Sequence, residues 1–182
     1  DGGPAIAAKF RRPVALAVDR NGDVFVADSE DHRVRRIAAA DGRIYAFAGN
    51  GSEGDSGDLG LATQASFGAP VSIAFNIHGS LYIVDQTNER VRKVYGDGYI
   101  TAFAGTGEGG PLGDGGPALL AVLTNPTSVA VGLDQSVLIG DGSRRIRRVD
   151  PTGTIRTVGG MGQDGDADSG VPFESAPLGL GL

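Results

Sequence analysis

The chain has 182 residues, a formal net charge of −6, 31 glycines and no cysteine or tryptophan. The acidic balance argues against a protein whose main partner is nucleic acid, because binding to phosphates needs a basic face. The lack of cysteine excludes a disulfide framework and thiol chemistry, and no apolar run approaches the roughly 20 residues of a membrane-spanning helix.

Three similar segments follow one another along the chain, beginning at Pro13, Pro70 and Pro126, and Pro177 stands where a fourth would begin. Each segment holds four short runs rich in Val, Ile, Phe and Tyr, bounded by Gly, Asn, Asp or Ser, which is typical of strands. In chain order the runs are 14–18, 23–28, 33–37 and 43–49, then 71–75, 80–85, 90–94 and 99–105, then 127–131, 136–141, 145–149 and 154–160.

The spacing between successive repeats is 57 and then 56 residues, measured from Pro13 to Pro70 and from Pro70 to Pro126. Four antiparallel strands at such a period are typical of a propeller blade. We therefore predict an all-β propeller segment over residues 1–182, with three four-stranded antiparallel blades at about 13–49, 70–105 and 126–160 and the first strand of a fourth. Glycine-rich loops between blades are expected at 50–69, 106–125 and 161–176, with short helical turns after Pro4, Thr63 and Pro117.

The repeat carries a family resemblance. Each unit contains an acid that ends a run, followed by a basic run, as in DSEDHRVRRI, DQTNERVRKV and DGSRRIRRV, and the first two units end in AFAG. This pattern resembles the NHL repeat, and residues 105–126 are similar to its long-loop bacterial and extracellular version. The resemblance implies a propeller of the six-bladed type, used mostly as a binding platform. The third unit departs from the pattern, because Gln135 stands where the others have a hairpin glycine.

The acid that ends the second run of each repeat faces the arginine that begins the third, across a hairpin. A bidentate arginine–carboxylate pair suits this position between packed blades. We predict three structural ion pairs: Asp28 with Arg33, Asp85 with Arg90, and Asp141 with Arg145. Their recurrence argues against a catalytic carboxylate, because a single active site does not need three copies.

The other basic residues of the third runs are expected on a solvated outer surface, with an anionic partner as the alternative. They are Arg35, Arg36, Arg92, Lys93, Arg147 and Arg148. Related NHL domains bind single-stranded RNA on a basic face with aromatic help. Here the basic runs are not interleaved with aromatic residues, so nucleic acid is not the expected partner.

A ligand is expected where the connections between second and third strands share a face with the loops between blades, since binding residues concentrate on loops of a rigid scaffold. The polar residues of that face are Glu30, Asp31, His32, Asn88, Glu89 and Arg144. No motif singles these residues out, and the favoured interpretation is that they are ordinary exposed polar residues at the place where a ligand would bind.

No catalytic residue or resident metal is predicted. The innermost strands offer no histidine or carboxylate, and the two histidines, His32 and His78, occupy hairpins on opposite faces. Asp164, Asp166 and Asp168 alternate as calcium ligands do, but the EF-hand glycine is replaced by Ser169. A solvated glycine-rich turn is therefore the favoured interpretation of this segment, and calcium is the alternative.

The favoured function is a non-enzymatic binding scaffold, presenting a loop face for protein or glycan contact within a larger protein. One alternative is a propeller lyase or hydrolase whose catalytic residues lie in other blades. Another is a self-assembling structural repeat. Three blades leave two apolar faces open, so we expect further blades of a longer chain, or a second copy that closes a ring. The start of the chain shows no charged leader, and an extracellular or cell-envelope location is favoured.

Overall fold

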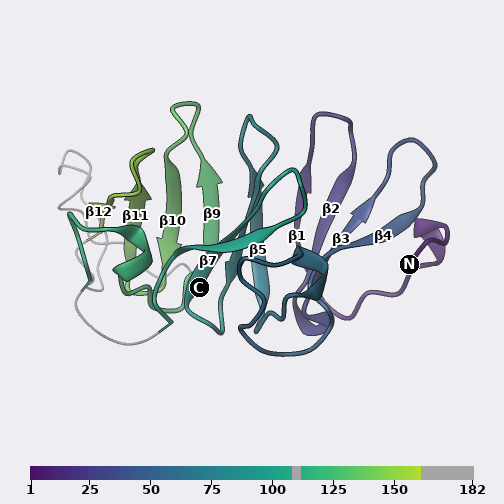
Figure 1. Cartoon of the computed structure of the whole chain (residues 1–182), viewed down its shortest axis with the longest axis horizontal. Coiled ribbons are helices and arrows are strands. Elements are labelled where there is room, and N and C mark those ends of the chain that lie inside the picture. The colour runs from purple at the N-terminus through teal and green to yellow at the C-terminus, as the bar shows by residue number, and fades with distance from the viewer. Residues whose placement is uncertain (108–111, 161–182) are drawn as a thin grey trace.

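The computed structural model describes residues 1–107 and 112–160 and is all-β, with three separate four-stranded antiparallel sheets (Figure 1). This confirms the predicted propeller segment. The first sheet contains β1 (Pro13–Val18), β2 (Val24–Asp28), β3 (Arg33–Ile37) and β4 (Ile44–Ala48). The second contains β5 (Pro70–Phe75), β6 (Leu81–Asp85), β7 (Arg90–Val94) and β8 (Ile100–Ala104). The third contains β9 (Ser128–Val131), β10 (Val137–Asp141), β11 (Arg145–Val149) and β12 (Ile155–Gly159). The predicted fourth-blade strand lies outside the described residues.

The sheets stand side by side as blades 1, 2 and 3, with each strand paired to the next along the chain (Figure 1). The first strands β1, β5 and β9 lie beside one another along the arc. A hydrogen bond of 3.1 Å from the Val129 amide to Ser72 Oγ joins the inner strands of blades 2 and 3. The arrangement is that of successive blades in a propeller.

The core lies between the blades, because the middle strands are apolar on both faces. In β6, Leu81 and Ile83 pack toward blade 1, whereas Tyr82 and Val84 pack toward blade 3. This alternation follows from the two-residue period of a strand. A blade with a neighbour on each side is therefore buried throughout its second strand.

The loop between blades 1 and 2 is part of this core. After β4 it follows the outer strand of blade 2, where Leu61 forms a bridge to Tyr99, and it then returns between the blades. The buried residues Ala65 and Phe67 fill the space between the two sheets. Two of the expected helical turns are the short 3-10 helices η1 (Ala5–Ala7) and η4 (Ala118–Leu120). The third helix, η3 (Ala62–Gln64), ends at Gln64, where the turn expected after Thr63 would begin.

The first hairpin of blade 3 closes without a glycine at the usual position. Gly22 and Gly79 have φ values of 83° and 80° in blades 1 and 2. Gln135 adopts the same left-handed region, with a φ of 66°. Asp134 supports this turn by accepting hydrogen bonds from the amide and hydroxyl of Ser136.

The inner strand of blade 1 exposes an apolar stripe. Leu16 and Val18 are 68% and 60% exposed. Leu16 holds the repeat position of Ile73, which is only 6% exposed because blade 1 covers it. The stripe is therefore the face that a preceding blade would bury. Within the described residues, no helix has the length and apolar character needed to cross a membrane.

Candidate functional site

The acid that ends the second strand of each blade binds backbone amides of the preceding loop. Asp28 accepts hydrogen bonds from the amides of Arg11 and Arg12. The shortest of them, from Arg12, is 2.6 Å. Asp85 accepts from Gly68 and Ala69 at 2.9 and 3.1 Å. Burial raises the pKa of Asp85, although these amides and Asn88 oppose that shift. Each acid thus fixes the chain just before its own blade.

Asp141 repeats this arrangement in blade 3, where the amides of Thr124 and Ser143 each lie 3.0 Å from its Oδ1. Its second oxygen lies 3.6 Å from Arg147. The acid is therefore bound by the loop and by an arginine two residues beyond the predicted Arg145.

The arginine that begins each third strand lies opposite the acid in the strand register, as expected, but its side chain contacts other groups. Arg33 binds Asp31 at 3.0 Å and the carbonyl of Asn50 at 2.9 Å. Arg90 lies 3.7 Å from Asp55 and also binds loop carbonyls. The structure thus replaces the predicted pairs Asp28–Arg33 and Asp85–Arg90 with contacts to loops. The physical reason is that backbone amides already satisfy the buried carboxylates.

Arg145 donates to the carbonyl of Ser143 at 3.3 Å. Together with Arg33 and Arg90, it holds its own turn at the end of the blade. The three arginines therefore contribute to the shape of the connections on the predicted ligand face.

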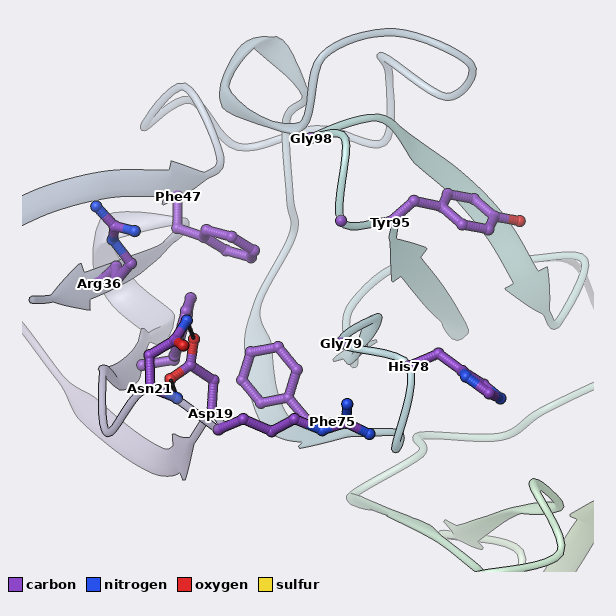
Figure 2. A pocket seen from close by; sticks show the side chains of 12 residues that line it. Asp19, Asn21, Arg36, Phe47, Phe75, His78, Gly79, Tyr95 and Gly98 are labelled. Atoms are coloured by element: carbon purple, nitrogen blue, oxygen red, sulfur yellow. Dashed lines mark hydrogen bonds between the residues drawn. The ribbon is translucent and has the colours of Figure 1, made fainter.

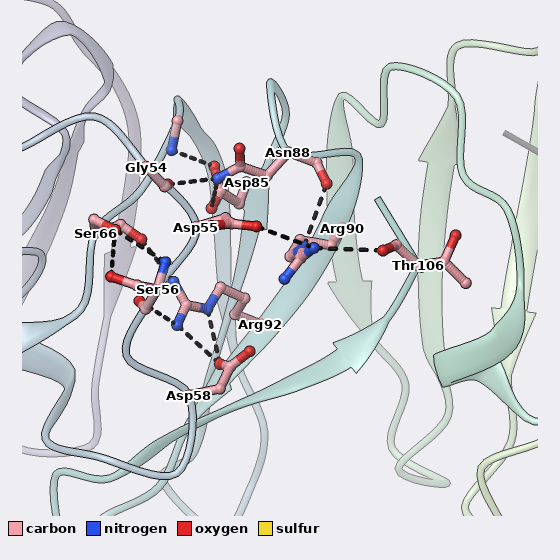
Figure 3. Close-up of polar contacts among 11 residues, drawn as sticks. Gly54, Asp55, Ser56, Asp58, Ser66, Asp85, Asn88, Arg90, Arg92 and Thr106 are labelled. Atoms are coloured by element: carbon pink, nitrogen blue, oxygen red, sulfur yellow. Dashed lines mark hydrogen bonds and ion pairs between the residues drawn. The ribbon is translucent and has the colours of Figure 1, made fainter. Parts of the chain in front are cut away.

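The next arginine of each basic run holds the loop that precedes its blade, as Figure 3 shows for Arg92. Arg92 is 0% exposed and pairs with Asp58 at 2.8 Å. It also donates to the carbonyls of Ser66 and Ser56 at 2.7 and 3.1 Å, and its guanidinium lies 4.9 Å from the centre of the Phe67 ring. The cation thus crosslinks two parts of one glycine-rich loop.

The same anchor recurs in the other blades. Arg35 pairs with Asp1 at 2.7 Å, and Arg147 pairs with Asp114 at 2.7 Å. Burial opposes ionisation of Asp114, but hydrogen bonds from Thr157 and the charge of Arg147 leave its pKa below the ordinary value. The expected solvated surface is therefore wrong for three basic residues, Arg35, Arg92 and Arg147, which are buried. Arg36, Lys93 and Arg148 are partly exposed.

The signal for this anchor is present in the sequence. Asp58 and Asp114 lie 34 and 33 residues before their arginines, and Asp1 lies 34 before Arg35. A repeated acid at a nearly constant sequence distance from a repeated arginine indicates a pair. Strand alternation alone does not reveal which arginine the loop reaches.

The predicted ligand residues lie on one end of the arc, here called the loop face and formed by the turns 29–32, 86–89 and 142–144. The last residue of each turn is left-handed, with φ values of 53°, 50° and 61° at His32, Glu89 and Arg144. Asn88 donates to the carbonyl of Gly54 and to Asp85, and is therefore structural. Glu30 is exposed.

Two further residues of this face have internal partners. Asp31 binds Arg33 at 3.0 Å and lies 3.6 Å from Arg11. His32 Nδ1 lies 2.6 Å from the carbonyl of Gly68. Because a carbonyl only accepts, Nδ1 is the donor in this contact. Of the predicted ligand residues, Asn88, Asp31 and His32 thus have partners within the protein, whereas Glu30 is exposed and available to a ligand.

A cavity of about 420 Å³ opens on the loop face between blades 1 and 2. Glu30, His32 and Arg12 line it with charged or polar groups, while Val14 and Val71 of the inner strands are apolar. Arg12 and Glu30 are 3.7 Å apart, with side chains 66% and 60% exposed. Such a pair is weak in water, so both groups are available to a ligand.

A second cavity, of about 380 Å³, lies at the opposite end between the same blades (Figure 2). The rings of Phe47 and Phe75 lie 4.7 and 4.8 Å from that of Phe25, both edge to face. Arg36 lines one side, 3.3 Å from Asp23, and His78 belongs to this cavity. The two histidines therefore lie at different cavities, as predicted.

No cluster of His, Asp and Glu suited to a metal ion occurs within residues 1–107 and 112–160. The calcium alternative at Asp164, Asp166 and Asp168 lies outside the described residues and stays a prediction.

The three sheets and their repeated acids and arginines define a propeller domain of the NHL type. A family model described as the teneurin NHL domain matches residues 2–95, and the chain belongs to that family. Human teneurin-1 is 32% identical over 102 residues, which cover 50% of this chain and 4% of teneurin-1. The chain thus spans a small part of this relative.

Solved structures agree on the fold. A catalytically inactive virginiamycin B lyase from Staphylococcus aureus, with quinupristin, aligns with a TM-score of 0.57 and 17% identity over 83% of this chain and 42% of that chain. A chain of a nidogen/laminin complex aligns with a TM-score of 0.57 and 17% identity, over 80% of this chain and 47% of its own. At these identities the likeness concerns the fold alone.

Proposed function

We propose that this domain is a non-enzymatic binding scaffold within a larger protein, and that its loop face contacts a protein partner. The observation that carries the proposal is the cavity of about 420 Å³ between blades 1 and 2, with Glu30, His32 and Arg12 around an apolar floor. A protein side chain fits a cavity that combines apolar depth with a few polar groups.

The arginine anchors support this function because they hold the surrounding loops before any partner arrives. Arg33 holds the start of the loop between blades 1 and 2, and Arg92 holds its middle and end. A preformed surface loses less conformational entropy on binding than a flexible one. The nidogen/laminin complex provides an example of a similar fold in a protein assembly.

A glycan is the second class of partner. A lyase or hydrolase with catalytic residues elsewhere is the alternative that the fold of virginiamycin B lyase favours. An extracellular or cell-envelope location stays a prediction, which fractionation of the native protein would test.

The proposal is tested by placing a photocrosslinking amino acid at Glu30, with Arg156 on the outer strand β12 as the matched control position. Both side chains are exposed. When the labelled chain is added to an extract of its native source, we expect position 30 to crosslink saturably to one protein. Excess domain without the photocrosslinking group should compete for that protein and reduce the crosslinks. Equal crosslinking from both positions would contradict the proposal, and crosslinks only to glycan would favour the second class.

A further inference from the structure

One position of the repeat carries a basic residue in all three blades but has different partners. Arg36, Lys93 and Arg148 lie opposite Phe25, Tyr82 and Leu138 in the strand register. Arg36 pairs with Asp23 at 3.3 Å, and Arg148 pairs with Asp134 at 2.8 Å. Within the described residues, Lys93 contacts aromatic rings and has no carboxylate within ion-pair distance.

The sequence explains the difference. Ser80 occupies in blade 2 the position that Asp23 occupies in blade 1, directly before the second strand. His78 occupies the position of Asp134 of blade 3, two residues earlier. Blade 2 therefore lacks both acids that neutralise the equivalent cation in its neighbours.

Aromatic side chains hold Lys93 without neutralising it. Its Nζ lies 4.4 Å from the centre of the Tyr95 ring and 5.5 Å from that of Tyr82. The ring faces attract the cation but leave its positive charge available to an anion. The side chain of Lys93 is partly buried, so an anion there is screened less than on an open surface.

Lys93 lines a cavity of about 350 Å³ between blades 2 and 3. Most of the lining is apolar and includes Phe103, Pro117 and Leu119, while Thr101 and Thr152 add hydroxyl groups. Leu119 and Tyr95 are 51% and 39% exposed. The cavity thus combines one unneutralised cation with exposed apolar surface.

The equivalent cavity between blades 1 and 2 provides an internal comparison (Figure 2). There, Phe47 and Arg36 occupy the repeat positions of Phe103 and Lys93. Asp23 neutralises Arg36 in that cavity. The two cavities therefore share a basic residue and a ring at equivalent repeat positions, but Lys93 lacks the carboxylate partner that Arg36 has.

We propose that this cavity binds an acidic side chain of a protein partner, with its carboxylate on Lys93 and a neighbouring apolar residue against Leu119 and Tyr95. The charge complementarity selects an anion, and the apolar lining favours a peptide over a sugar, which needs more directed hydrogen bonds. The site goes beyond the loop-face function, because it lies at the opposite end of the blades.

The test uses the isotope-labelled chain and two small probes, N-acetyl-glutamyl-leucine amide and its neutral glutaminyl counterpart. We expect the acidic probe, at millimolar concentration, to shift the amide resonances of Thr101, Ala102 and Gly153. Lys93→Gln should weaken its binding about tenfold, the size expected for a hydrogen bond to a charged group. Arg36→Gln, at the same repeat position in blade 1, is the matched control and should leave binding unchanged.

Ser80→Asp provides an independent variant, because it restores the acid of blade 1 beside Lys93 and should abolish binding of the acidic probe. A dispersed spectrum for each variant establishes that it is folded. Equal binding of the acidic and neutral probes, or undiminished binding to Lys93→Gln, would overturn the proposal. Tighter binding of glucuronic acid than of the acidic dipeptide would overturn the choice of a peptide.

Discussion

Buried arginines of this domain act as crosslinks between a blade and the loop that precedes it. Arg92 satisfies its guanidinium with one carboxylate and two carbonyls, so that the full charge is accommodated in the interior. Arg33 uses similar contacts for the loop that follows its blade. In the third strand of a blade, the first arginine thus holds the loop that follows the blade, and the arginine two residues later holds the loop that precedes it.

Replacing Arg92 by alanine should destabilise the domain by about 3 kcal/mol, because Asp58 and the loop carbonyls lose their buried partner. Denaturant unfolding followed by circular dichroism measures the change. Arg156→Ala, at an exposed strand position, is the control and should stay within about 0.5 kcal/mol of the parent. Equal losses in both variants would show that the anchor contributes nothing.

The turn of blade 3 predicts an acid-sensitive contribution to stability. Hydrogen bonds from Ser136 and Arg148 lower the pKa of Asp134 from 3.8 to about 2. Because the pKa of Asp134 is lower in the folded state, its ionised carboxylate stabilises the fold at pH values above the ordinary pKa of 3.8. This stabilisation is lost as the pH falls from 3.8 through about 2. Asp134→Asn should therefore flatten the fall in melting temperature between these pH values, and an unchanged slope would contradict the assignment.

The contacts of individual side chains are also what the sequence predicts least. The acids and basic runs are recognisable, and the register that sets Asp85 opposite Arg90 is observed. The choice of partners is not predictable from alternation, because Arg90 and Arg92 lie on the same side of the strand. The path of the glycine-rich loop decides which guanidinium is buried, and that path depends on contacts between distant residues.

At the scale of the element, the local sequence pattern determines the strands, whereas close packing between the blades determines the path of the loops. Each strand is recognisable from short apolar runs between turn residues. Connecting loops generally run over the surface of a protein, but Ala65 and Phe67 are fully buried between the blades. Gly57 permits this, since a Cβ there would lie 2.6 Å from the Cα of Ala65.

Gly57→Ala should therefore cost more stability than a glycine replacement in open space. Gly153 is the matched control, because its φ of 87° is also left-handed but, among the described residues other than its chain neighbours, no heavy atom lies within 4 Å of the place that a Cβ would take. We expect about 1–2 kcal/mol for Gly153→Ala and about 1–3 kcal/mol more for Gly57→Ala. Thermal unfolding of both variants measures the difference, and equal losses would show that the loop does not pack closely.

At the scale of the whole molecule, the repeat explains why one side of the arc exposes an apolar surface. Leu16 is 68% exposed at the position where Ile73 is 6% exposed. The sequence predicts such an open face, since blades are apolar on both sides. Burial of Leu16 by another blade would remove from water a surface similar to the one buried inside this chain.

We expect the isolated chain to associate with itself through β1 in a concentration-dependent way. Sedimentation velocity measures the mass, and Leu16→Glu should shift the chain toward the monomer. Leu133→Glu, at a residue 91% exposed on the β9–β10 turn, is the control and should leave association intact. A chain that stays monomeric at every concentration would contradict this expectation.

Hydrogen exchange of the loop at residues 54–68 tests most directly whether the binding face is preformed. The amides of Gly54 and Ser66 donate to the backbone, and Arg92 holds the carbonyl of Ser66. In the parent chain these amides should exchange slowly, as in a strand, and Arg92→Ala should accelerate them while leaving β10 and β11 protected. Fast exchange in the parent chain would contradict the account of a scaffold whose loops are fixed by buried arginines.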